Sequence, residues 1–429
     1  MMKGAGTEVR RRYRQVRRLW QEGGSREVLN RVRRAVAGRL APAVFHLPVR
    51  RADILAADLT MPRTWPPLAL GYDEPIIINW VTTPPAPGSG GHTTMFRLIE
   101  YLERAGHQCR VYIYDVHGGD PSYFSSQVRK LHPRFRGPVA DVMKGMAAAH
   151  AVVATSWQTA YPVFNDPCAG KRFYLVQDFE PWFYPVGGQS VLAENTYRMG
   201  FHGITAGRFL SGKLKSEYGM AADAFEFGCD TATYHLSNYG ARDGIVFYAK
   251  PDAPRRAFEV GIAALQLFAQ RHPGLTIHLY GSAVGNLPFR FVDHGVLRPD
   301  QLNQIYNHCF AGLSLSMTNA SLVPHEMLSA GCIPVVNETE HNHIVLNNPF
   351  VHYAVPTPHA LADALHGVVS NEEFDALATS ASASVSSMSW DAAGAAMEQC
   401  LRRNLSRSNG AGNVGDFRFE AAQAASIGT

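Results

Sequence analysis

Three cations follow a predicted strand in the second half of this sequence of 429 residues. The apolar run GIVFYA (244–249) is typical of a buried strand, and Lys250, Arg255 and Arg256 come after it around a proline-rich turn. Cations at a helix start oppose the helix dipole, whereas a bound anion removes that conflict. Arginine can also contact two phosphate oxygens at once. The cluster therefore favours a diphosphate site over ordinary surface charge.

A carboxylate follows another predicted strand. The stretch LSLSMTNASLVPHEMLSAGCIPVV (313–336) indicates a strand, a polar loop, a short helix after Pro324 and a second strand after Gly331. Such a unit brings a helix N-terminus to the carboxyl edge of a parallel sheet, where phosphates and sugars bind. Glu326 is expected to accept hydrogen bonds from two ribose hydroxyls, or else it only complements the helix dipole. The pair formed with His325 is not HExxH, which excludes a zinc peptidase.

The loop PPAPGSGGHTT (84–94) joins the first predicted strand to its helix. Glycines let the backbone approach a ligand closely, and the amides of a helix N-terminus can meet an anion or a hydroxyl. Gly90, Gly91 and His92 are therefore candidate donor-binding residues, with a flexible turn as the alternative. The loop is not GxGxxG, and it lacks the acidic residue of a dinucleotide site.

The segment DFEPWFYP (178–185) sets two carboxylates among aromatic residues and prolines. Asp178, Glu180 and Trp182 resemble a sugar-acceptor surface, and Asp178 is also a candidate catalytic residue; roles as cap and turn residues remain open. Asp-x-Glu also imitates the acidic metal-binding motif of a different fold, whose pattern the rest of the chain lacks. GRFLSGKL (207–214) nearly matches a phosphate loop, but Leu214 replaces the required hydroxyl residue, so an amphipathic helix is predicted.

Charge is unevenly distributed along the chain. Residues 1–51 hold thirteen arginines and one lysine against three glutamates, a net charge of +11 within a total of +4, so the remainder carries −7. Apolar residues at helical spacing predict a basic amphipathic helix on a membrane surface, with a solvated tail or a packed helix as alternatives. A nucleic-acid partner is not expected, since no basic aromatic-lined sheet or zinc module accompanies the charge.

The length predicts two domains, and no segment is long and apolar enough to span a membrane. Six scattered cysteines without a CxxC pair argue against a disulfide framework or zinc site and for a reducing compartment. Apolar strands alternate with amphipathic helices from residue 75, which predicts an α/β protein with two doubly wound parallel sheets and a cleft between them. The expected divisions are a basic segment (1–74), two Rossmann-like domains (75–228 and 229–388), a helix crossing back (389–404) and a disordered tail (405–429).

With these residues placed, residues 75–400 resemble a GT-B glycosyltransferase of the family 4 type. The family's donor motif has two glutamates separated by seven residues; Glu326 matches the second, and Thr318 stands where the first is expected. FGCD (227–230) resembles the family's interdomain turn, and Gln177 corresponds to its first-domain histidine. The resemblance implies a diphosphate held by the basic cluster, and donor contacts at His294, Gly295, Val296, Asn319, Ser321, Leu322 and Val323.

Five long segments in the same order also resemble the WsaF-type rhamnosyltransferases. They are PGSGGHTTMFRLIEYL (87–102), LVQDFEPWFYPVG (175–187), ENTYRMGFHGITAGRFLS (194–211), FYAKPDAPRRAFE (247–259) and VPHEMLSAGCIPVVN (323–337). This resemblance implies dTDP-L-rhamnose as donor, a growing glycan as acceptor, and retention of anomeric configuration without a metal or other cofactor. Lys250 and Arg256 would then stabilise the charge on the leaving diphosphate, while Gln177, Asp178, Glu180 and Trp182 would face the acceptor. The implied location is cytoplasmic, on the inner face of the membrane. The alternatives are a transferase using a UDP- or GDP-hexose, a nucleotide-sugar epimerase, or a glycan-binding scaffold.

Overall fold

The structure is a computed structural model of the whole chain. It describes residues 17, 29, 32, 33, 36, 47–86, 88–238 and 240–408. Contacts divide the chain into residues 1–48 and residues 49–429, and the second unit contains both sheets. Most of the membrane-surface helix expected within residues 1–51 and most of the tail expected at residues 405–429 lie outside the described residues. Residues 405–408 were assigned to that tail, but they form the end of a helix that runs from Trp390 to Ser408. Among the described helices, none is long and apolar enough to cross a bilayer.

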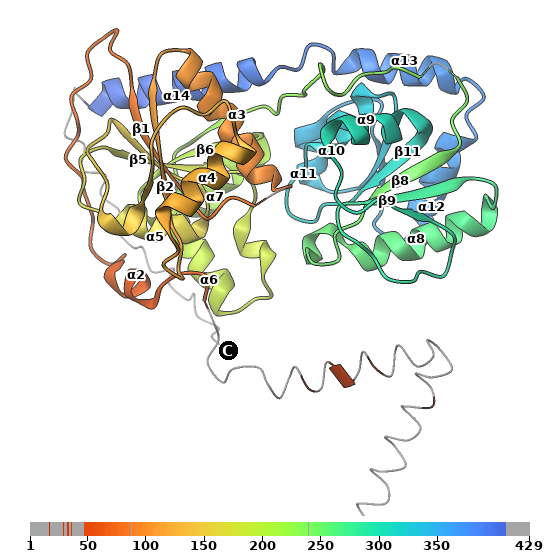
Figure 1. The fold of residues 1–429 in the computed structure, drawn as a ribbon, viewed down its shortest axis with the longest axis horizontal. Coiled ribbons are helices and arrows are strands. Elements are labelled where there is room, and N and C mark those ends of the chain that lie inside the picture. The colour runs from red at the N-terminus through yellow and green to blue at the C-terminus, as the bar shows by residue number, and fades with distance from the viewer. Residues whose placement is uncertain are drawn as a thin grey trace, which may run out of the picture. The chain divides into compact units, whose positions relative to one another are not determined.

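The N-terminal lobe (residues 49–228) is a seven-stranded parallel sheet in the order β3-β2-β1-β4-β5-β6-β7 (Figure 1). Its strands are β1 (Ile77–Thr82), β2 (Gln108–Ile113), β3 (Val139–Asp141), β4 (Ala151–Ala154), β5 (Lys171–Val176), β6 (His202–Ala206) and β7 (Ala222–Phe225). Its helices are α2 (Arg51–Ala56), α3 (Gly90–Arg104), α4 (Pro121–Leu131), α5 (Trp157–Asn165), α6 (Gly188–Asn195) and α7 (Arg208–Tyr218), with short 3₁₀ turns η1 (Val142–Lys144), η2 (Glu180–Phe183) and η3 (Thr196–Arg198).

The C-terminal lobe (residues 229–388) is a six-stranded parallel sheet in the order β10-β9-β8-β11-β12-β13. Its strands are β8 (Gly244–Tyr248), β9 (Thr276–Tyr280), β10 (Val292–Asp293), β11 (Cys309–Ser314), β12 (Ile333–Asn337) and β13 (His352–Ala354). Its helices are η4 (Pro254–Arg256), α8 (Phe258–Arg271), α9 (Pro299–His308), α10 (Val323–Ser329), α11 (Glu340–Leu346), α12 (Pro358–Val369) and α13 (Phe374–Ser384). The predicted α/β class with two parallel sheets is confirmed.

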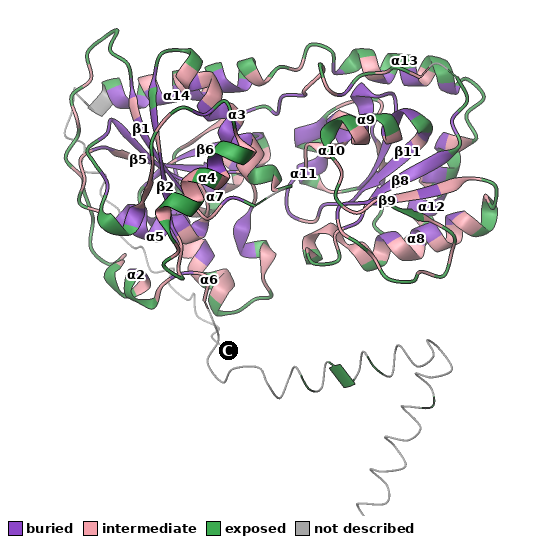
Figure 2. Ribbon diagram, in the orientation of Figure 1, coloured by how far each residue is buried: buried purple, intermediate pink, exposed green. Residues whose placement is uncertain are grey.

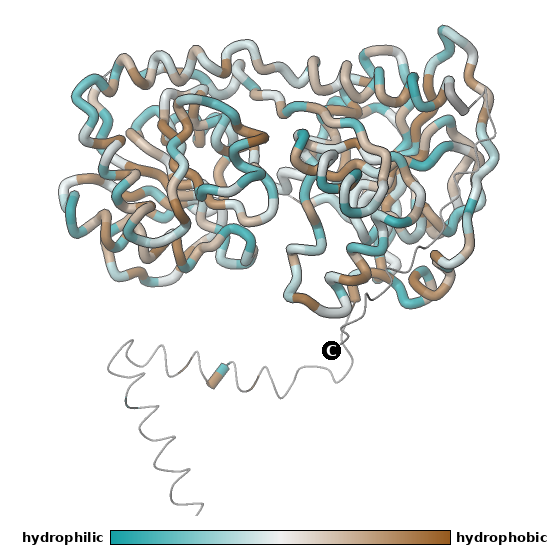
Figure 3. The backbone as a smooth tube through the Cα atoms, turned by 180° about the vertical axis from the view of Figure 1, so that it is seen from behind, coloured by the Kyte–Doolittle hydropathy of each residue, from teal (hydrophilic) through white to brown (hydrophobic). Residues whose placement is uncertain are grey.

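Side chains alternate across each sheet because successive strand residues point to opposite faces. In β5, Phe173 and Leu175 pack toward α3, whereas Tyr174 and Val176 pack toward α5 and α7. In the C-terminal lobe, α8 and α12 cover one face, and α9 and α10 cover the other (Figure 1). Both faces of every central strand are therefore buried (Figure 2), which explains why these strands are nearly continuous apolar runs. Apolar residues gather inside each lobe in Figure 3.

Residues 49–74, assigned from the sequence to the basic N-terminal segment, pack on the N-terminal lobe. Val49 is buried, and the hydroxyl of Tyr114, the residue after β2, donates to Asp53 Oδ2 at 2.6 Å. The guanidinium of Arg172 stacks over the Trp65 ring at 4.8 Å. The N-terminal lobe thus includes residues 49–74 and does not start at residue 75. The sequence did not indicate this, because isolated apolar anchors in a proline-rich stretch lack the periodicity that marks a helix or strand.

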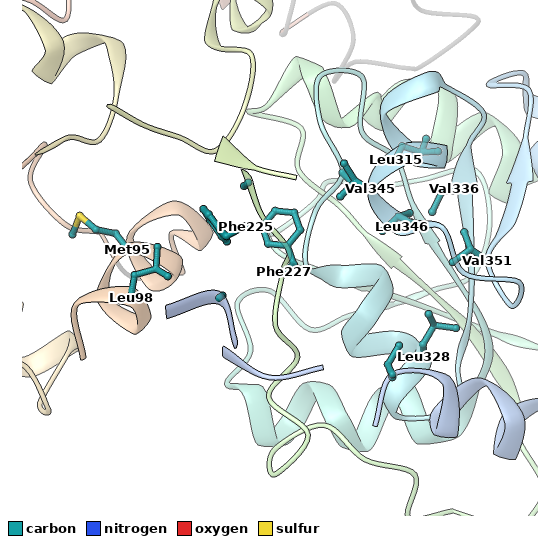
Figure 4. Close-up of a cluster of buried hydrophobic side chains, with 14 of the residues drawn as sticks. Met95, Leu98, Phe225, Phe227, Leu315, Leu328, Val336, Val345, Leu346 and Val351 are labelled. Carbon is teal, nitrogen blue, oxygen red and sulfur yellow. The ribbon is translucent and has the colours of Figure 1, made fainter. Parts of the chain in front are cut away.

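Two segments cross between the lobes. The first crossing, residues 227–230, leads into the C-terminal lobe. The second crossing, residues 385–390, leads from α13 back to α14 (Trp390–Ser408), which packs on α3 and β7. A Cβ on Gly228 would lie 2.5 Å from the backbone nitrogen of Trp390, so only glycine lets the crossings touch here. One apolar cluster continues across both lobes, and Figure 4 shows part of it, from Met95 through Phe225 and Phe227 to Val345.

Candidate functional site

Loops at the carboxyl ends of both sheets are tied together by the side chain of Asn319, which follows β11. Its Nδ2 donates to the carbonyl of Gln177, after β5, at 2.9 Å and to that of Ala206, at the end of β6, at 3.2 Å. Gln177 Nε2 in turn donates to the carbonyl of Gly91 on α3 at 3.0 Å. The structure therefore brings the predicted glycine loop, the DFEPWFYP segment and the β11–α10 loop to one place. Ligand sites of parallel α/β sheets form at such edges.

The two arginines sit in a backbone conformation that the fold holds in place. The carbonyl of Arg255 accepts a hydrogen bond from Met317 N at 2.9 Å. Ala257, directly after them, has a φ of 45°, a left-handed conformation that is strained for a residue with a Cβ. Strain of this kind is maintained only where surrounding contacts over-determine it. The turn thus fixes Arg255 and Arg256 at the end of β8 with little freedom to move away.

Both guanidinium groups retain unused hydrogen-bonding capacity. Arg255 stacks on the ring of Phe183 at 4.4 Å, and its Nε lies 3.7 Å from Asp178 Oδ2 without a hydrogen-bond partner. Arg256 Nη1 is buried and also unpartnered, and burial lowers the pKa of this arginine, an effect that Arg255 reinforces and Asp178 opposes. Two fixed cations with one nearby carboxylate form a site that an anion would complete.

Asp178, from the N-terminal lobe, lies beside the two arginines of the C-terminal lobe. Burial raises the pKa of its carboxyl, while Arg256, Thr318, Arg255 and the amide of Phe179 oppose that rise. Its Oδ1 accepts from Phe179 N at 2.9 Å. Asp178 is thus the carboxylate that faces the arginines. It belongs to the N-terminal lobe, whereas Thr318, which stands in place of the donor motif's first glutamate, belongs to the C-terminal lobe.

The β11–α10 loop buries several polar side-chain atoms that have no hydrogen-bond partner. Thr318 and Asn319 are each only 1% exposed, yet Thr318 Oγ1 and Asn319 Oδ1 lack partners of ordinary geometry. The hydroxyls of Ser314 and Ser321 and His325 Nδ1 share this condition. Each buried unsatisfied group costs about 1–3 kcal/mol. Their concentration between the end of β11 and the first turn of α10 indicates groups held ready for a ligand rather than random defects of packing.

Glu326 lies in α10, with its carboxylate close to charges from outside its own helix. Burial raises the pKa of Glu326 to about 7; Arg97 opposes this rise and Asp230 adds to it. The neighbouring His325 is buried, which lowers its pKa to about 4. Leu322 and Val323 begin the helix, whose first amides have no intrahelical partner. Glu326 is therefore poised between a carboxylate and a carboxylic acid at neutral pH.

Three other residues predicted to bind the donor lie at the end of β8 or at the start of α3. His92 braces the glycine loop, with Nδ1 2.8 Å from Ser89 Oγ and Nε2 3.2 Å from the Thr83 carbonyl, and burial lowers its pKa. Gly90 begins α3, and Lys250 directly follows Ala249 at the end of β8, half-buried.

The HGVL segment (294–297) approaches the same glycine loop. A Cβ on Gly88 would lie 3.9 Å from the exposed Val296. His294 Nε2 lies 2.9 Å from His278 Nδ1, and Gly295 has a left-handed φ of 58° and gives its carbonyl to Gly281 N. The Val296 side chain of the C-terminal lobe therefore approaches the glycine loop just before α3.

Glu180 does not face the arginines. It is 6% exposed, its Oε2 accepts from Trp157 N at 2.6 Å, and its Oε1 accepts from the hydroxyl of Tyr174 at 3.3 Å. Burial raises its pKa to about 8. These contacts make Glu180 a cap for α5 inside the N-terminal lobe. Trp182, by contrast, is 45% exposed, with Lys213 Nζ 4.8 Å above its ring.

One cluster of potential metal ligands lies elsewhere, between β6, β7 and α14. Donor atoms of His202, Asp223 and Cys400 lie within 4.8 Å of one another. Asp223 already bonds His202 at 2.8 Å and Arg403 at 2.6 Å, and burial raises the pKa of Cys400 to about 12. A neutral thiol and a carboxylate paired with arginine are poor ligands, so the contacts read as anchoring for α14.

Sequence reasoning did not identify Arg97, and it named Asp230 only as part of the FGCD turn, not as a residue that acts on Glu326. Arg97 on α3 lies 3.4 Å from Asp230 in the first crossing, and both influence the Glu326 carboxyl. They are separated by 133 positions. The only available signal was the FGCD resemblance, which pointed to Asp230 but not to its partner.

Comparisons with known proteins agree with this geometry. Residues 243–366 match the family model described as WsaF, C-terminal domain. The O-antigen biosynthesis protein RfbC of Myxococcus xanthus is 31% identical over 319 residues, which are 70% of this chain and 25% of that protein. The chain thus spans about a quarter of the length of this curated relative.

Solved structures share the fold. Anabaena Alr3699/HepE in complex with UDP and glucose is 13% identical, covers 78% of this chain and 99% of its own, and has a TM-score of 0.57. A putative UDP-N-acetylglucosamine 2-epimerase from Listeria monocytogenes is 11% identical, covers 78% and 98%, and has a TM-score of 0.53. This chain therefore has the GT-B fold of these solved structures, its residues 243–366 are similar to the C-terminal domain of WsaF, and a stretch of 319 residues is similar to part of an O-antigen biosynthesis protein.

Proposed function

We propose that the chain transfers a rhamnosyl residue from dTDP-L-rhamnose to a saccharide acceptor, a lipid-linked or cell-surface glycan. One observation carries this proposal: buried, unpartnered polar atoms converge on two fixed arginines where loops of both lobes meet. They belong to Arg255, Arg256, Thr318, Asn319 and Ser321. A nucleoside-diphosphate sugar supplies what they lack, namely charged oxygens for the arginines and hydroxyls for the loop.

In this proposal the donor lies across the C-terminal lobe. Arg255, Arg256 and Lys250 bind the diphosphate, and Glu326 accepts the two ribose hydroxyls. Backbone groups of residues 294–296 meet the base, and residues 319–323 meet the transferred sugar. Gly90, Gly91 and His92 close the pocket from the other lobe. Thr318, where the family has a carboxylate, leaves less capacity to hold sugar hydroxyls, which suits a 6-deoxy sugar.

The chemistry requires charge stabilisation more than a base. The bond from the sugar's C1 to the diphosphate oxygen breaks, and negative charge grows on that oxygen. Arg256, Arg255 and Lys250 stabilise this charge in a site of low dielectric. The acceptor hydroxyl attacks C1 from the face that the diphosphate leaves and gives its proton to the leaving phosphate, so configuration is retained. The cations supply the charge neutralisation, and the proposal therefore needs no metal ion.

Asp178 has two roles in this scheme. Its carboxylate lies 3.7 Å from Arg255 Nε, so it orients that arginine before the diphosphate arrives. It also lies on the N-terminal lobe beside Gln177, and with the exposed Trp182 it forms the proposed acceptor surface. Glu180 is left out of this surface because its carboxylate is bonded inside the lobe.

Two further observations bear on the acceptor and on the location of the protein. Homology to an O-antigen biosynthesis protein supports a polysaccharide acceptor. The +11 charge of residues 1–51 supports contact with an anionic membrane surface, where each basic residue contributes about 1 kcal/mol. We therefore propose a cytoplasmic protein held peripherally on the inner face of the cell membrane.

A thermal-shift screen of dTDP-, UDP- and GDP-sugars tests the donor. A ligand at 100 times its dissociation constant stabilises the folded state by about 2.7 kcal/mol, which suffices to rank the nucleotides. We expect dTDP-L-rhamnose to give the largest shift. A clear preference for a UDP- or GDP-sugar would instead identify a hexosyltransferase of the same fold. Lys250→Ala and Glu326→Ala should lose the shift, whereas Arg208→Ala, at an exposed ion pair with Glu226, should keep it.

The epimerase alternative is favoured by one observation, the shared fold of the Listeria protein. Incubation with donor alone distinguishes the two reactions. An epimerase converts the sugar nucleotide to its isomer without an acceptor, whereas the proposed transferase leaves it unchanged or hydrolyses it slowly. Appearance of an isomeric sugar nucleotide would overturn the transferase proposal. Donor binding with no acceptor ever modified would favour a glycan-binding scaffold.

A further inference from the structure

Arg97, on the third turn of α3, contacts both crossings between the lobes. Its Nη2 lies 3.4 Å from Asp230 Oδ2 in the first crossing, and its guanidinium lies 4.7 Å from the centre of the Trp390 ring at the start of the second. Thr233 Oγ1 donates to the same Asp230 oxygen at 3.0 Å. Arg97 is therefore a cation of the N-terminal lobe placed where the chain enters and leaves the C-terminal lobe.

The first crossing contacts both Arg97 and α10, the helix that contains Glu326. Cys229 Sγ donates to the carbonyl of His325 at 3.6 Å, so residue 229 packs on α10 one position before Glu326. Asp230 follows directly and pairs with Arg97. The charged groups that act on the Glu326 carboxyl are thus one cation from α3 and one carboxylate from the crossing.

The other titratable groups around Glu326 are neutral at physiological pH. They come from the crossing, from the segment after it, from β9 and from α9: Cys229, Tyr234, Tyr280 and Tyr306. Burial raises the pKa of every one of them. The ionisation of Glu326 therefore depends on burial and on the balance between Arg97 and Asp230.

We infer that Arg97 is a positioning residue for the nucleotide: from the opposite lobe it maintains Glu326 as the carboxylate that accepts both ribose hydroxyls, and Asp230 weakens this action. The inference rests on the proposed function, because it names what controls the ribose contact. An ionised carboxylate accepts from two vicinal hydroxyls, whereas a protonated one keeps a hydrogen that must find its own acceptor. Nucleotide affinity then depends on which form is present.

The sign of the pH dependence follows directly. Glu326 has a pKa raised to about 7, so it holds a proton at pH 6 and is ionised at pH 8. Nucleotide affinity is expected to be full above that pKa and to fall below it. Removing Arg97 raises the pKa further and moves the loss of affinity to higher pH; removing the charge of Asp230 moves it to lower pH. A shift of one unit changes affinity about tenfold on the acid side.

The test is the dissociation constant of dTDP, and separately of UDP, for the full chain by calorimetry from pH 5.5 to 9. We expect the Arg97→Gln midpoint to move upward, with weaker binding at pH 7 that recovers at pH 9. Asp230→Asn should move it downward, Arg97→Lys should restore the wild-type profile, and Glu326→Gln should remove the pH dependence. Arg104→Gln is the matched control: Arg104 lies on the same helix and pairs with Asp391 of α14, so it tests helix packing without the charge at Glu326.

The outcomes separate this inference from the proposed function. If neither nucleotide binds the wild type at any pH, both are overturned. If the wild type binds with a midpoint near 7 but Arg97→Gln and Asp230→Asn leave that midpoint in place, the nucleotide site stands and the role of Arg97 is wrong. Equal weakening at all pH values in Arg97→Gln and Arg104→Gln, with unchanged midpoints, would show a purely structural contact.

Discussion

The loops that follow the strands of the two lobes differ in how their polar side chains are bonded. In the N-terminal lobe, polar side chains of the predicted motifs bond to the lobe's own backbone: His92 to Thr83, Gln177 to Gly91 and Glu180 to Trp157. In the C-terminal lobe, the corresponding loops bury polar atoms that have no partner, at Arg256 and Thr318 among others. Among the predicted motif residues, those of the N-terminal edge bond mainly to their own lobe, whereas several of those at the C-terminal edge keep atoms without a partner.

This difference separates a scaffold from a binding site. A satisfied polar network makes the backbone rigid, so the N-terminal edge presents fixed groups such as Asp178 and Trp182. An unsatisfied network is costly in the free protein, and a ligand that supplies the missing partners recovers that cost on binding. The comparison therefore predicts that the more tightly bound ligand binds to the C-terminal lobe, which agrees with the proposed donor site there. It also predicts that equivalent substitutions in the two lobes have different consequences.

The largest expected effect comes from Arg256. Arg256→Ala removes a cation whose buried Nη1 has no other bond, and in the proposed function it leaves the developing charge of the diphosphate with one cation fewer. Removing one such preorganised donor typically lowers kcat by about 10²–10³-fold. Steady-state kinetics with donor and acceptor measure the loss. Arg256→Lys keeps the charge without the two-pronged geometry and should recover only part of the rate. Activity within threefold of wild type for Arg256→Ala would contradict the comparison.

Glu326→Gln gives the next effect, on affinity alone. Hydrogen bonds to a charged acceptor are worth about 1.5–3 kcal/mol, so we expect donor affinity to fall about tenfold to a hundredfold at pH 8. Glu326 forms no bond that holds the lobe together among the described contacts, and its burial opposes ionisation. The free energy of unfolding at pH 8 should therefore stay the same or rise. Calorimetry and urea denaturation of the same preparation measure both quantities.

Glu180→Gln is the matching change in the N-terminal lobe and should affect stability alone. The folded pKa is raised from 4.5 to about 8, so the folded state keeps a proton that the unfolded chain releases. This contribution is fully present below about pH 4.5 and is lost as pH rises toward 8, by up to a few kcal/mol at about 1.4 kcal/mol per unit. Glutamine stays neutral, so the variant should gain stability relative to wild type across that window.

Urea denaturation at pH 5, 7 and 9 checks this, with acceptor KM as the functional control. An unchanged KM supports the scaffold role of Glu180. A large rise in acceptor KM with no change in the pH dependence of stability would place its carboxylate on the acceptor surface, as the sequence first suggested.

Sequence alone predicted the central strands and the cations, and it failed where the signal is not local. Runs such as GIVFYA identify strands that are buried on both faces. Three short strands at sheet edges, β3, β7 and β10, were missed because an edge needs little apolar sequence. Arg97 could not be found, since its partner Asp230 is far along the chain. Glu180 sits in a motif that looks functional, and only its bond to Trp157 N reveals a cap.

The smallest expected effect, at Thr318, tests whether unused polar atoms are a cost kept for function. Thr318→Val replaces a buried hydroxyl, which forms no hydrogen bond of ordinary geometry although it helps to lower the pKa of the Asp178 carboxyl, by a methyl group of similar size. The free protein should gain up to about 1 kcal/mol in its free energy of unfolding, because the penalty of the poorly satisfied hydroxyl outweighs its weak contact with Asp178. Donor affinity should fall several-fold if the hydroxyl bonds the sugar. Thr318→Ser keeps the hydroxyl and is the control for lost methyl packing. Lower stability together with unchanged donor affinity in Thr318→Val would mean that the hydroxyl serves the free protein, and the contrast between the two lobes would no longer hold at this residue.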